Sequence, residues 1–213
     1  MYASSSSVYG LNQNVPFNED SNTDHPKSLY AATKKSNELM AHAYADLYKL
    51  PVTGLRFFTV YGPWGRPDMA LFIFTKAIFL GEQIDLYNNG NMRRDFTYID
   101  DICEAIIKLS FKPAAGLKNF DNKKPKSGIS SSPYKLFNIG NNHPVSLKIY
   151  IKYLEEIIGK KAKVNFKPMQ LGDVKLTHSN STALKNYIDF NPNTDVKEGI
   201  KKFIFWYKSY YNV

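Results

Sequence analysis

The sequence predicts an α/β fold from the order of its elements, one strongly apolar run and its composition. Helical patterns alternate with short apolar runs along the 213 residues, as is typical of strand–helix–strand units. The run VTGLRFFTV at residues 52–60 is rich in β-branched and aromatic side chains, which suits a strand buried in a parallel sheet. Hydrophobic residues make up 43% of the chain and aromatic residues 15%, too much for a disordered polypeptide.

The individual elements follow from local signals. Residues 2–10 are expected to form the tip of a strand that enters a loop. A long helix should begin near Ser28 and end before Pro51, because proline cannot continue it. Further helices are expected at residues 70–81, 101–111, 146–159 and 196–211, and short strands at residues 84–87, 95–99, 135–139 and 163–166. Residues 123–133 form a polar loop rich in Pro, Gly and Ser.

The positive charge does not predict a nucleic-acid-binding protein. The formal net charge is +9, but only residues 118–126 and 160–167 are locally dense in lysine. A nucleic-acid-binding surface would gather Lys and Arg with aromatic residues on one face. Lysines spread over solvated faces explain most of the excess, and a diphosphate substrate would also favour a positive site.

Other classes of protein are disfavoured as well. No run approaches the roughly 18 consecutive apolar residues of a membrane span, and the first residues lack the pattern of a signal peptide. The single cysteine, Cys103, cannot form an internal disulfide, and its helical setting predicts a buried thiol. We therefore expect a cytoplasmic protein with no membrane partner and no metal site.

The strongest local signal for catalysis is the pair Tyr30 and Lys34. At positions i and i+4 of a helix, two side chains share one face with their Cβ atoms about 5–6 Å apart. A neighbouring ammonium favours the phenolate form of a tyrosine, and a phenolate can act as a general base. The spacing alone is common, and an ordinary solvated helix is the alternative.

The surrounding segments favour a site. Residues 4–7 are four consecutive serines at a strand end, where hydroxyl groups can relay a proton or hold a sugar. Residues 55–63 form a strand that closes into a Gly-Pro loop, and ligands bind at the carboxyl ends of strands in open α/β sheets. Arg93 and Arg94 offer guanidinium groups suited to a diphosphate, with structural salt bridges as the alternative.

Five segments together carry a family resemblance. They are ASSSSVYG (3–10), HPKSLYAATKKSNE (25–38), GLRFFTVYGPWGRPDMA (54–70), NNGNMRRDFTYIDD (88–101) and QLGDV (170–174). With these five segments in this order, the chain resembles the extended short-chain dehydrogenase/reductase epimerases over nearly its whole length. Within them it resembles the UDP-glucuronate 4-epimerases most. The resemblance implies part of a Rossmann-type doubly wound parallel sheet (1–65), interleaved with a smaller C-terminal α/β substrate-binding region (66–213).

The resemblance also implies roles for individual residues. Ser5, Tyr30 and Lys34 would form the catalytic triad. Tyr30 and Lys34 would also touch the nicotinamide ribose of NAD, and Phe57 and Phe58 would bring backbone near its carboxamide. Substrate roles are implied for Ser6, Ser7 and Thr59 at the hexose and its carboxylate, Arg66 in a substrate loop, Arg94 at the diphosphate, the backbone from Ile84 to Tyr87 at uracil, and Asp173 at the uridine ribose.

The implied reaction is the NAD-dependent 4-epimerisation of UDP-glucuronate to UDP-galacturonate through a 4-keto intermediate, in an enzyme that is a homodimer when complete. Dehydratases of the same superfamily carry an Asp-Glu pair where this chain has Ser6 and Ser7, which disfavours dehydration. UDP-glucose, UDP-galactose and N-acetylated UDP-sugars remain alternative substrates, and a truncated, non-catalytic remnant or subunit remains an alternative function.

The glycine pattern departs from the family. None of the 12 glycines forms G-x-x-G-x-x-G or G-x-G-x-x-G, and the nearest approach, Gly62 and Gly65, is followed by Asp68. Such a turn binds the pyrophosphate of NAD at a helix N-terminus. We therefore expect an N-terminally incomplete chain that lacks this part of the NAD site, and inactivity of the isolated chain is an open alternative. We also expect the chain to be marginally stable alone.

Overall fold

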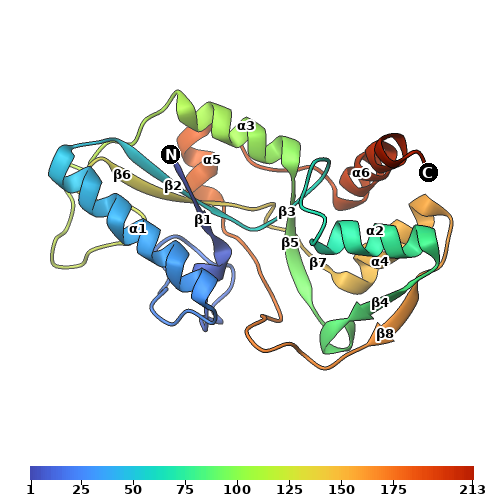
Figure 1. Cartoon of the computed structure of the whole chain (residues 1–213). Coiled ribbons are helices and arrows are strands. Elements are labelled where there is room, and N and C mark those ends of the chain that lie inside the picture. Colours follow the sequence, from blue (N-terminus) through green and yellow to red (C-terminus); the bar gives the residue numbers. More distant parts are fainter.

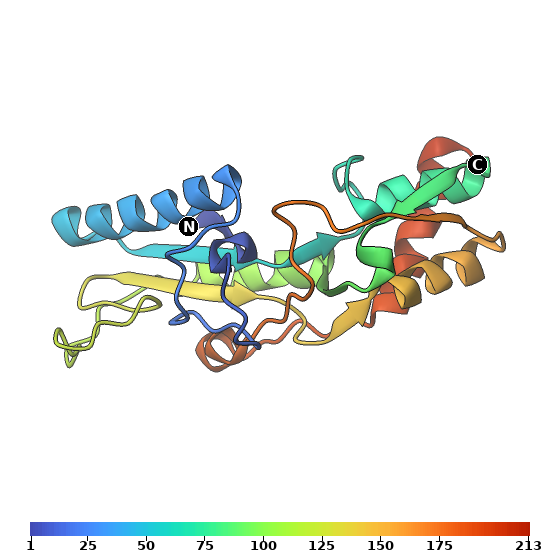
Figure 2. The same ribbon diagram turned by 90° about the horizontal axis from the view of Figure 1, so that it is seen from below.

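The computed structural model describes all residues from Met1 to Val213 and has two lobes side by side (Figure 1). The first lobe contains a three-stranded parallel sheet with the order β1-β2-β6. Its strands are β1 (Tyr2–Ser5), β2 (Val52–Phe57) and β6 (Tyr134–Ile139). Helix α1 (Leu29–Tyr48) covers one face, and α3 (Ile99–Ser110) and α5 (Thr182–Ile188) cover the other (Figure 2).

The alternation of side chains along the strands builds the core of this lobe. Leu55 of β2 is in register with Phe137 of β6, and Phe57 with Ile139. Since successive strand residues point to opposite faces, these side chains lie together on one face of the sheet. They pack there against four buried residues of α3 and α5, namely Ile102, Ala105, Leu109 and Leu184.

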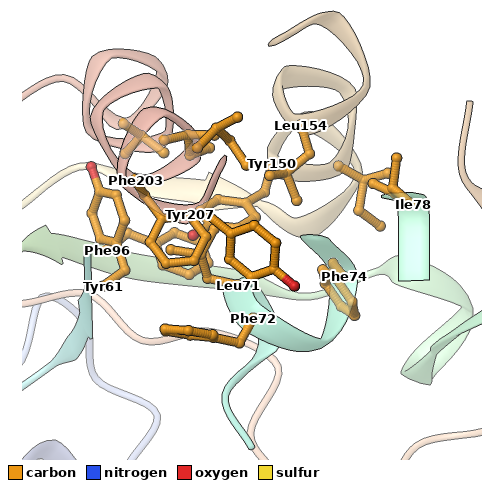
Figure 3. Packing of buried hydrophobic residues seen from close by; sticks show 14 of the residues in the cluster. Tyr61, Leu71, Phe72, Phe74, Ile78, Phe96, Tyr150, Leu154, Phe203 and Tyr207 are labelled. Carbon is orange, nitrogen blue, oxygen red and sulfur yellow. The ribbon is translucent and has the colours of Figure 1, made fainter. Parts of the chain in front are cut away.

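The second lobe is built from two small sheets and three helices. One sheet has the order β3-β5-β7, with β3 (Thr59–Tyr61), β5 (Arg93–Tyr98) and β7 (Pro144–Ser146); the other pairs β4 (Gln83–Leu86) with β8 (Lys163–Phe166). The helices are α2 (Ala70–Leu80), α4 (Leu147–Ile158) and α6 (Val196–Tyr211). They enclose the largest core of the molecule, which is rich in Tyr and Phe (Figure 3).

Helix α1 has the boundaries that its capping residues dictate. The Ser28 side chain accepts a hydrogen bond from the Ala31 backbone N–H, which satisfies one of the free donors at the helix start. The helix ends where Lys49 turns left-handed, two residues before Pro51. The predictions of this helix and of the four later helices are confirmed, with ends shifted by at most two residues.

The predicted strand at residues 52–60 is wrong in one respect, because it is two strands in two sheets. β2 ends at Phe57, and β3 begins at Thr59. Phe58 lies between them, and its side chain packs with Val8, Tyr9 and Phe17. The chain crosses between the lobes at this point, so one apolar run serves both.

The prediction of a buried Cys103 is also wrong, since the thiol is exposed on α3. The buried residues of this helix include Ile102, Ala105 and Leu109, and Cys103 lies one residue, or about 100°, away from Ile102 on the helix surface. Helix α5 and strand β7 were not expected from the sequence.

No helix of the chain combines the length and the apolar character that a membrane crossing would need. The structure contains no group of three His, Cys, Asp or Glu side chains placed to hold a metal ion.

Candidate active site

Tyr30 and Lys34 share one face of α1 beside the carboxyl end of β1. The Lys34 Nζ atom lies 5.8 Å from the centroid of the Tyr30 ring. It also donates a hydrogen bond to the Ala3 carbonyl oxygen of β1 at 3.1 Å. Tyr30 is 55% exposed, so its phenol is open to a ligand.

Ser5 lies at the end of β1 with its hydroxyl oxygen used twice as an acceptor. The Ser7 backbone N–H donates to Ser5 Oγ at 3.1 Å, and the Ser7 hydroxyl donates to the same oxygen at 2.9 Å. The hydroxyl proton of Ser5 is therefore left to donate to a third group. Ser6 begins the 3-10 helix η1 (Ser6–Tyr9) that follows.

A buried ion pair, which sequence reasoning missed, ties α1 to the sheet. The Arg56 guanidinium on β2 donates to both carboxylate oxygens of Glu38 on α1, at 2.8 Å each. The Ser4 hydroxyl donates to Glu38 Oε1 at 2.6 Å. Glu38 and Lys34 thus hold two consecutive residues of β1, Ser4 and Ala3, which fixes Ser5 relative to the helix. The signal in the sequence was an arginine in the middle of a buried apolar strand, because such a charge needs a partner.

The guanidinium of this ion pair is fully buried, since Arg56 is 0% exposed. Burial alone would raise the pKa of Glu38, but the hydrogen bonds and charge of Arg56 outweigh it and hold that pKa below its usual range. Arg56 also donates to the Tyr9 hydroxyl at 3.1 Å. Burial raises the pKa of Tyr9 to about 12, so this phenol stays neutral, and Tyr30 is the more accessible of the two.

A cavity of about 870 Å³ in the second lobe brings together most of the predicted substrate residues. It lies among β3, β4, β5 and α2, and Gln170 and Asp173 also line it. Five of the eight residues with an implied substrate role line it: Thr59, Ile84, Tyr87, Arg94 and Asp173. Its size is that of a typical small-molecule site.

Two of these residues neutralise each other. Arg94 Nη2 lies 2.7 Å from Asp173 Oδ1, and both side chains are partly or largely buried. Burial lowers the pKa of the Arg94 guanidinium, and the charge of Asp173 opposes this effect. Lys27 donates from its ammonium to the Asp173 carbonyl oxygen. An anion that enters the cavity can replace Asp173 as the hydrogen-bond acceptor of the Arg94 guanidinium.

Asp95, next to Arg94, fixes the strand that carries it, and sequence reasoning missed this residue too. Its carboxylate accepts hydrogen bonds from the backbone N–H groups of Asn141, Asn142 and Ser179 and from the Ser179 hydroxyl. The signal available in the sequence was an acidic residue placed between the arginine pair, Arg93 and Arg94, and the largely apolar segment that follows it.

The other predicted residues lie outside the large cavity. Arg66, in the loop between β3 and α2, lines a small neighbouring pocket together with Thr59, so Thr59 borders both. The Phe58 backbone N–H donates to the Ile139 carbonyl oxygen at 3.1 Å. Ser5, Ser6, Ser7, Tyr30, Lys34 and Phe57 do not line the cavity.

Comparison with known proteins places the chain in a family. Residues 1–123 match the model of the "NAD dependent epimerase/dehydratase family". Protein CapI of Staphylococcus aureus is 58% identical over 211 residues, which are 99% of this chain and 63% of that protein. A probable UDP-glucuronate 4-epimerase of Rhizobium meliloti (strain 1021) is 48% identical over 99% of this chain and 62% of its own length. The chain belongs to the NAD dependent epimerase/dehydratase family.

A solved structure supports the same fold. The UDP-glucuronic acid 4-epimerase from Bacillus cereus, in complex with UDP-glucuronic acid and NAD, superposes with a TM-score of 0.83 at 31% identity. The match covers 98% of this chain and 61% of that one. The chain therefore spans less than two thirds of the length of these relatives.

Proposed function

We propose that this chain carries the UDP-sugar site and the proton-transfer residues of an NAD-dependent 4-epimerase that converts UDP-glucuronate to UDP-galacturonate. The observation that carries the proposal is the cavity in the second lobe. It gathers Thr59, Ile84, Tyr87, Arg94 and Asp173 from four separate segments of the sequence. The similarity to enzymes named UDP-glucuronate 4-epimerases supports the choice of sugar nucleotide.

In this proposal the cavity binds the nucleotide. The Arg94 guanidinium exchanges its partner Asp173 for the diphosphate, since a charged bidentate donor suits phosphate oxygens. Asp173 is then free to accept hydrogen bonds from the ribose hydroxyls, and the backbone from Ile84 to Tyr87 contacts the uracil. Thr59 lies at the end of the cavity that leads to Arg66.

The sugar extends from there towards the first lobe. Ser6, Ser7 and Thr59 can donate hydrogen bonds to a hexose and its C6 carboxylate. The Tyr30 phenolate takes the proton from the 4-hydroxyl, directly or through the free proton of Ser5. The Lys34 ammonium, whose Nζ atom lies 5.8 Å from the centroid of the Tyr30 ring, orients the nicotinamide ribose beside that phenol.

The residues present fit one end of NAD. The exposed phenol of Tyr30, the neighbouring ammonium of Lys34 and the backbone of Phe57 and Phe58 could hold a nicotinamide riboside. When bound, NAD supplies the reversible hydride acceptor for C4 of the sugar. The 12 glycines include no dinucleotide-binding motif, so we propose that the pyrophosphate needs residues that this chain does not supply. The same observation favours a second candidate, a sugar-nucleotide-binding subunit without catalysis of its own.

Calorimetric titration of the chain with UDP-glucuronate tests the proposed nucleotide site. Arg94→Met should weaken binding roughly 10- to 100-fold, because a hydrogen bond to a charged group contributes about 1.5–3 kcal/mol. Arg93→Met is the matched control, since the Arg93 guanidinium is exposed and donates to the Pro144 carbonyl oxygen. Equal affinities for wild type and Arg94→Met would contradict the site.

A further inference from the structure

An exposed tryptophan joins the loop that carries Arg66 to the last helix. The loop comprises residues 62–69, between β3 and α2. The Trp64 ring lies 5.2 Å from the ring of Trp206 and 5.2 Å from that of Tyr210, both on α6. Trp206 and Tyr210 stack on each other with an interplanar angle of 19°. We call Trp64, Trp206 and Tyr210 the aromatic latch.

The latch holds the loop in an unusual conformation. Trp64 has a φ of 61°, a left-handed backbone that bulky side chains rarely adopt. Its side chain is also 74% exposed, so core burial does not explain this conformation. A strained residue persists where the surrounding structure fixes it, and the contacts of Trp64 with α6 are of that kind.

Arg66 has no anchor of its own outside the loop. Its guanidinium pairs with Asp68 at 3.2 Å and contacts the sulfur of Met69 at 3.4 Å. Its carbonyl oxygen accepts a hydrogen bond from the Met69 backbone N–H. The position of Arg66 relative to Thr59, with which it lines a pocket, therefore depends on how the loop is held.

We infer that Trp64 is a positioning residue: the aromatic latch places Arg66 beside Thr59, where the guanidinium selects UDP-sugars that carry a carboxylate on the hexose. The inference rests on the proposed function, because it assumes that the nucleotide occupies the cavity. Met69 and Asp68 of the loop line that cavity together with Thr59, so the loop forms the wall at its Thr59 end. A guanidinium held in place there loses less conformational freedom when it binds a carboxylate.

Five forms of the whole chain separate this role from simple packing: wild type, Trp64→Gly, Trp64→Phe, Arg66→Gln and the double variant Trp64→Gly/Arg66→Gln. Glycine adopts a positive φ without strain, so Trp64→Gly removes the ring and keeps the backbone conformation available. Each protein is titrated calorimetrically with UDP, UDP-glucose and UDP-glucuronate. Affinity for UDP reports on the fold and on the nucleotide site, and the affinity ratio of the two UDP-sugars reports on Arg66.

Wild type should prefer UDP-glucuronate. Trp64→Gly should lower that preference roughly tenfold, within the range of couplings between residues that act together, and leave the affinity for UDP unchanged. Trp64→Phe should keep most of the preference, because a phenyl ring retains an aromatic contact with α6. Arg66→Gln should itself lower the preference to what Ser6, Ser7 and Thr59 provide. In that background, adding Trp64→Gly should change nothing further.

Other results would overturn the inference in distinguishable ways. An unchanged preference in Trp64→Gly, or an equal effect of that substitution with and without Arg66, shows that the latch only packs the surface. A wild-type chain that binds none of the three ligands contradicts the proposed function, and the selectivity role falls with it. Trp64 and Trp206 are the only two tryptophans, so loss of their exciton-coupled circular dichroism in Trp64→Gly reports the latch itself, and its absence in wild type would also overturn the inference.

Discussion

Arg56 is a charged residue in the centre of a buried strand, and its partner Glu38 lies on the helix that carries Tyr30 and Lys34. A buried ion pair does not by itself add much stability, because desolvation offsets the attraction. It does penalise any structure in which one partner is missing. Here any displacement of α1 from β1 and β2 would separate the two charges and carry that penalty. The pair therefore fixes the position of α1, which carries Tyr30 and Lys34, relative to the strands.

Arg56→Met should destabilise the chain by about 3–5 kcal/mol, because it leaves the Glu38 carboxylate buried and unpaired. The free energy of unfolding in urea measures this loss. Arg56→Met combined with Glu38→Leu should recover much of it, since both charges are then gone. Lys35→Met is the control: the partly exposed Lys35 ammonium lies 3.6 Å from the Glu38 carboxylate, and its loss should cost less than about 1 kcal/mol. A double variant as unstable as the sum of the singles would contradict the pairing.

The same carboxylate predicts a pH dependence. The pKa of Glu38 is lowered in the folded chain from its ordinary value of 4.5. The unfolded state therefore binds the proton more readily, and the stabilisation is present above pH 4.5 and is lost as the pH falls through the folded pKa. Urea unfolding at a series of pH values between about 3 and 6 should show this loss in wild type. The part of this loss that is due to Glu38 should be missing in the double variant Arg56→Met/Glu38→Leu. An identical dependence of the unfolding free energy on pH in wild type and double variant would contradict the prediction.

Tyr30 is predicted to be the general base. Tyr30→Phe should lower kcat by about 10²–10⁴-fold, the usual contribution of a positioned proton acceptor, while the fold is kept because one oxygen is removed. The assay is UDP-glucuronate epimerisation by the chain joined to an NAD-binding segment with a G-x-x-G-x-x-G motif from a longer relative. Lys34→Ala should also be severely impaired. Tyr44→Phe, an exposed tyrosine on the same helix, is the control. A Tyr30→Phe variant with more than a tenth of the wild-type kcat would show that another group is the base.

At the scale of elements, the sequence predicted where helices begin and end better than which strands pair. Helix ends are set by local signals such as Ser28 and Pro51, which are visible in the sequence. The division of residues 52–60 between β2 and β3 depends on Ile139, whose carbonyl accepts from the Phe58 N–H, and that partner is far away in the chain. Helix α5 has only seven residues and no side-chain cap, so it left no clear pattern.

The contact of α6 with β3 depends on a glycine in the first turn of the helix. A Cβ atom at Gly199 would lie 2.1 Å from the Tyr61 hydroxyl oxygen and 2.7 Å from the Cζ atom. Gly199→Ala should therefore destabilise the chain by roughly 1–3 kcal/mol through overpacking, although alanine is the better helix former.

Thermal or urea unfolding measures this effect, with Ser209→Ala on the exposed face of α6 as the control. The Tyr61 hydroxyl is buried without a hydrogen-bond partner, so Tyr61→Phe should be tolerated. In that background Gly199→Ala should cost less, because the closest atom is gone. A stabilised Gly199→Ala variant would mean that α6 moves away from β3 without penalty.

At the scale of the whole molecule, the sequence predicted the parts of the site that lie in contiguous motifs. Tyr30 and Lys34 fall one turn apart on the same helix, so their approach follows from local geometry. The serine segment meets that helix only through packing, as in the hydrogen bond from Ser4 to Glu38. The Arg94–Asp173 pair and the aromatic latch could not be predicted, because each joins residues from distant segments that only the packed fold brings together. The domain boundary near residue 65 stays a prediction, and β6 and α5 of the first lobe both come from later in the chain.

The apolar surface of the first lobe predicts self-association of the chain. β1 is an edge strand with one side unpaired, and the outward face of α1 exposes Leu29, Met40 and Leu47. Exposed edges and apolar faces of this kind promote association. Size-exclusion chromatography with light scattering should show oligomers and a low, broad thermal transition. Met40→Lys with Leu47→Lys should shift the chain towards smaller species, whereas Leu171→Lys, at a fully exposed site in the other lobe, should not. A monodisperse wild-type monomer with a sharp transition at high temperature would mean that this surface is closed by the chain itself.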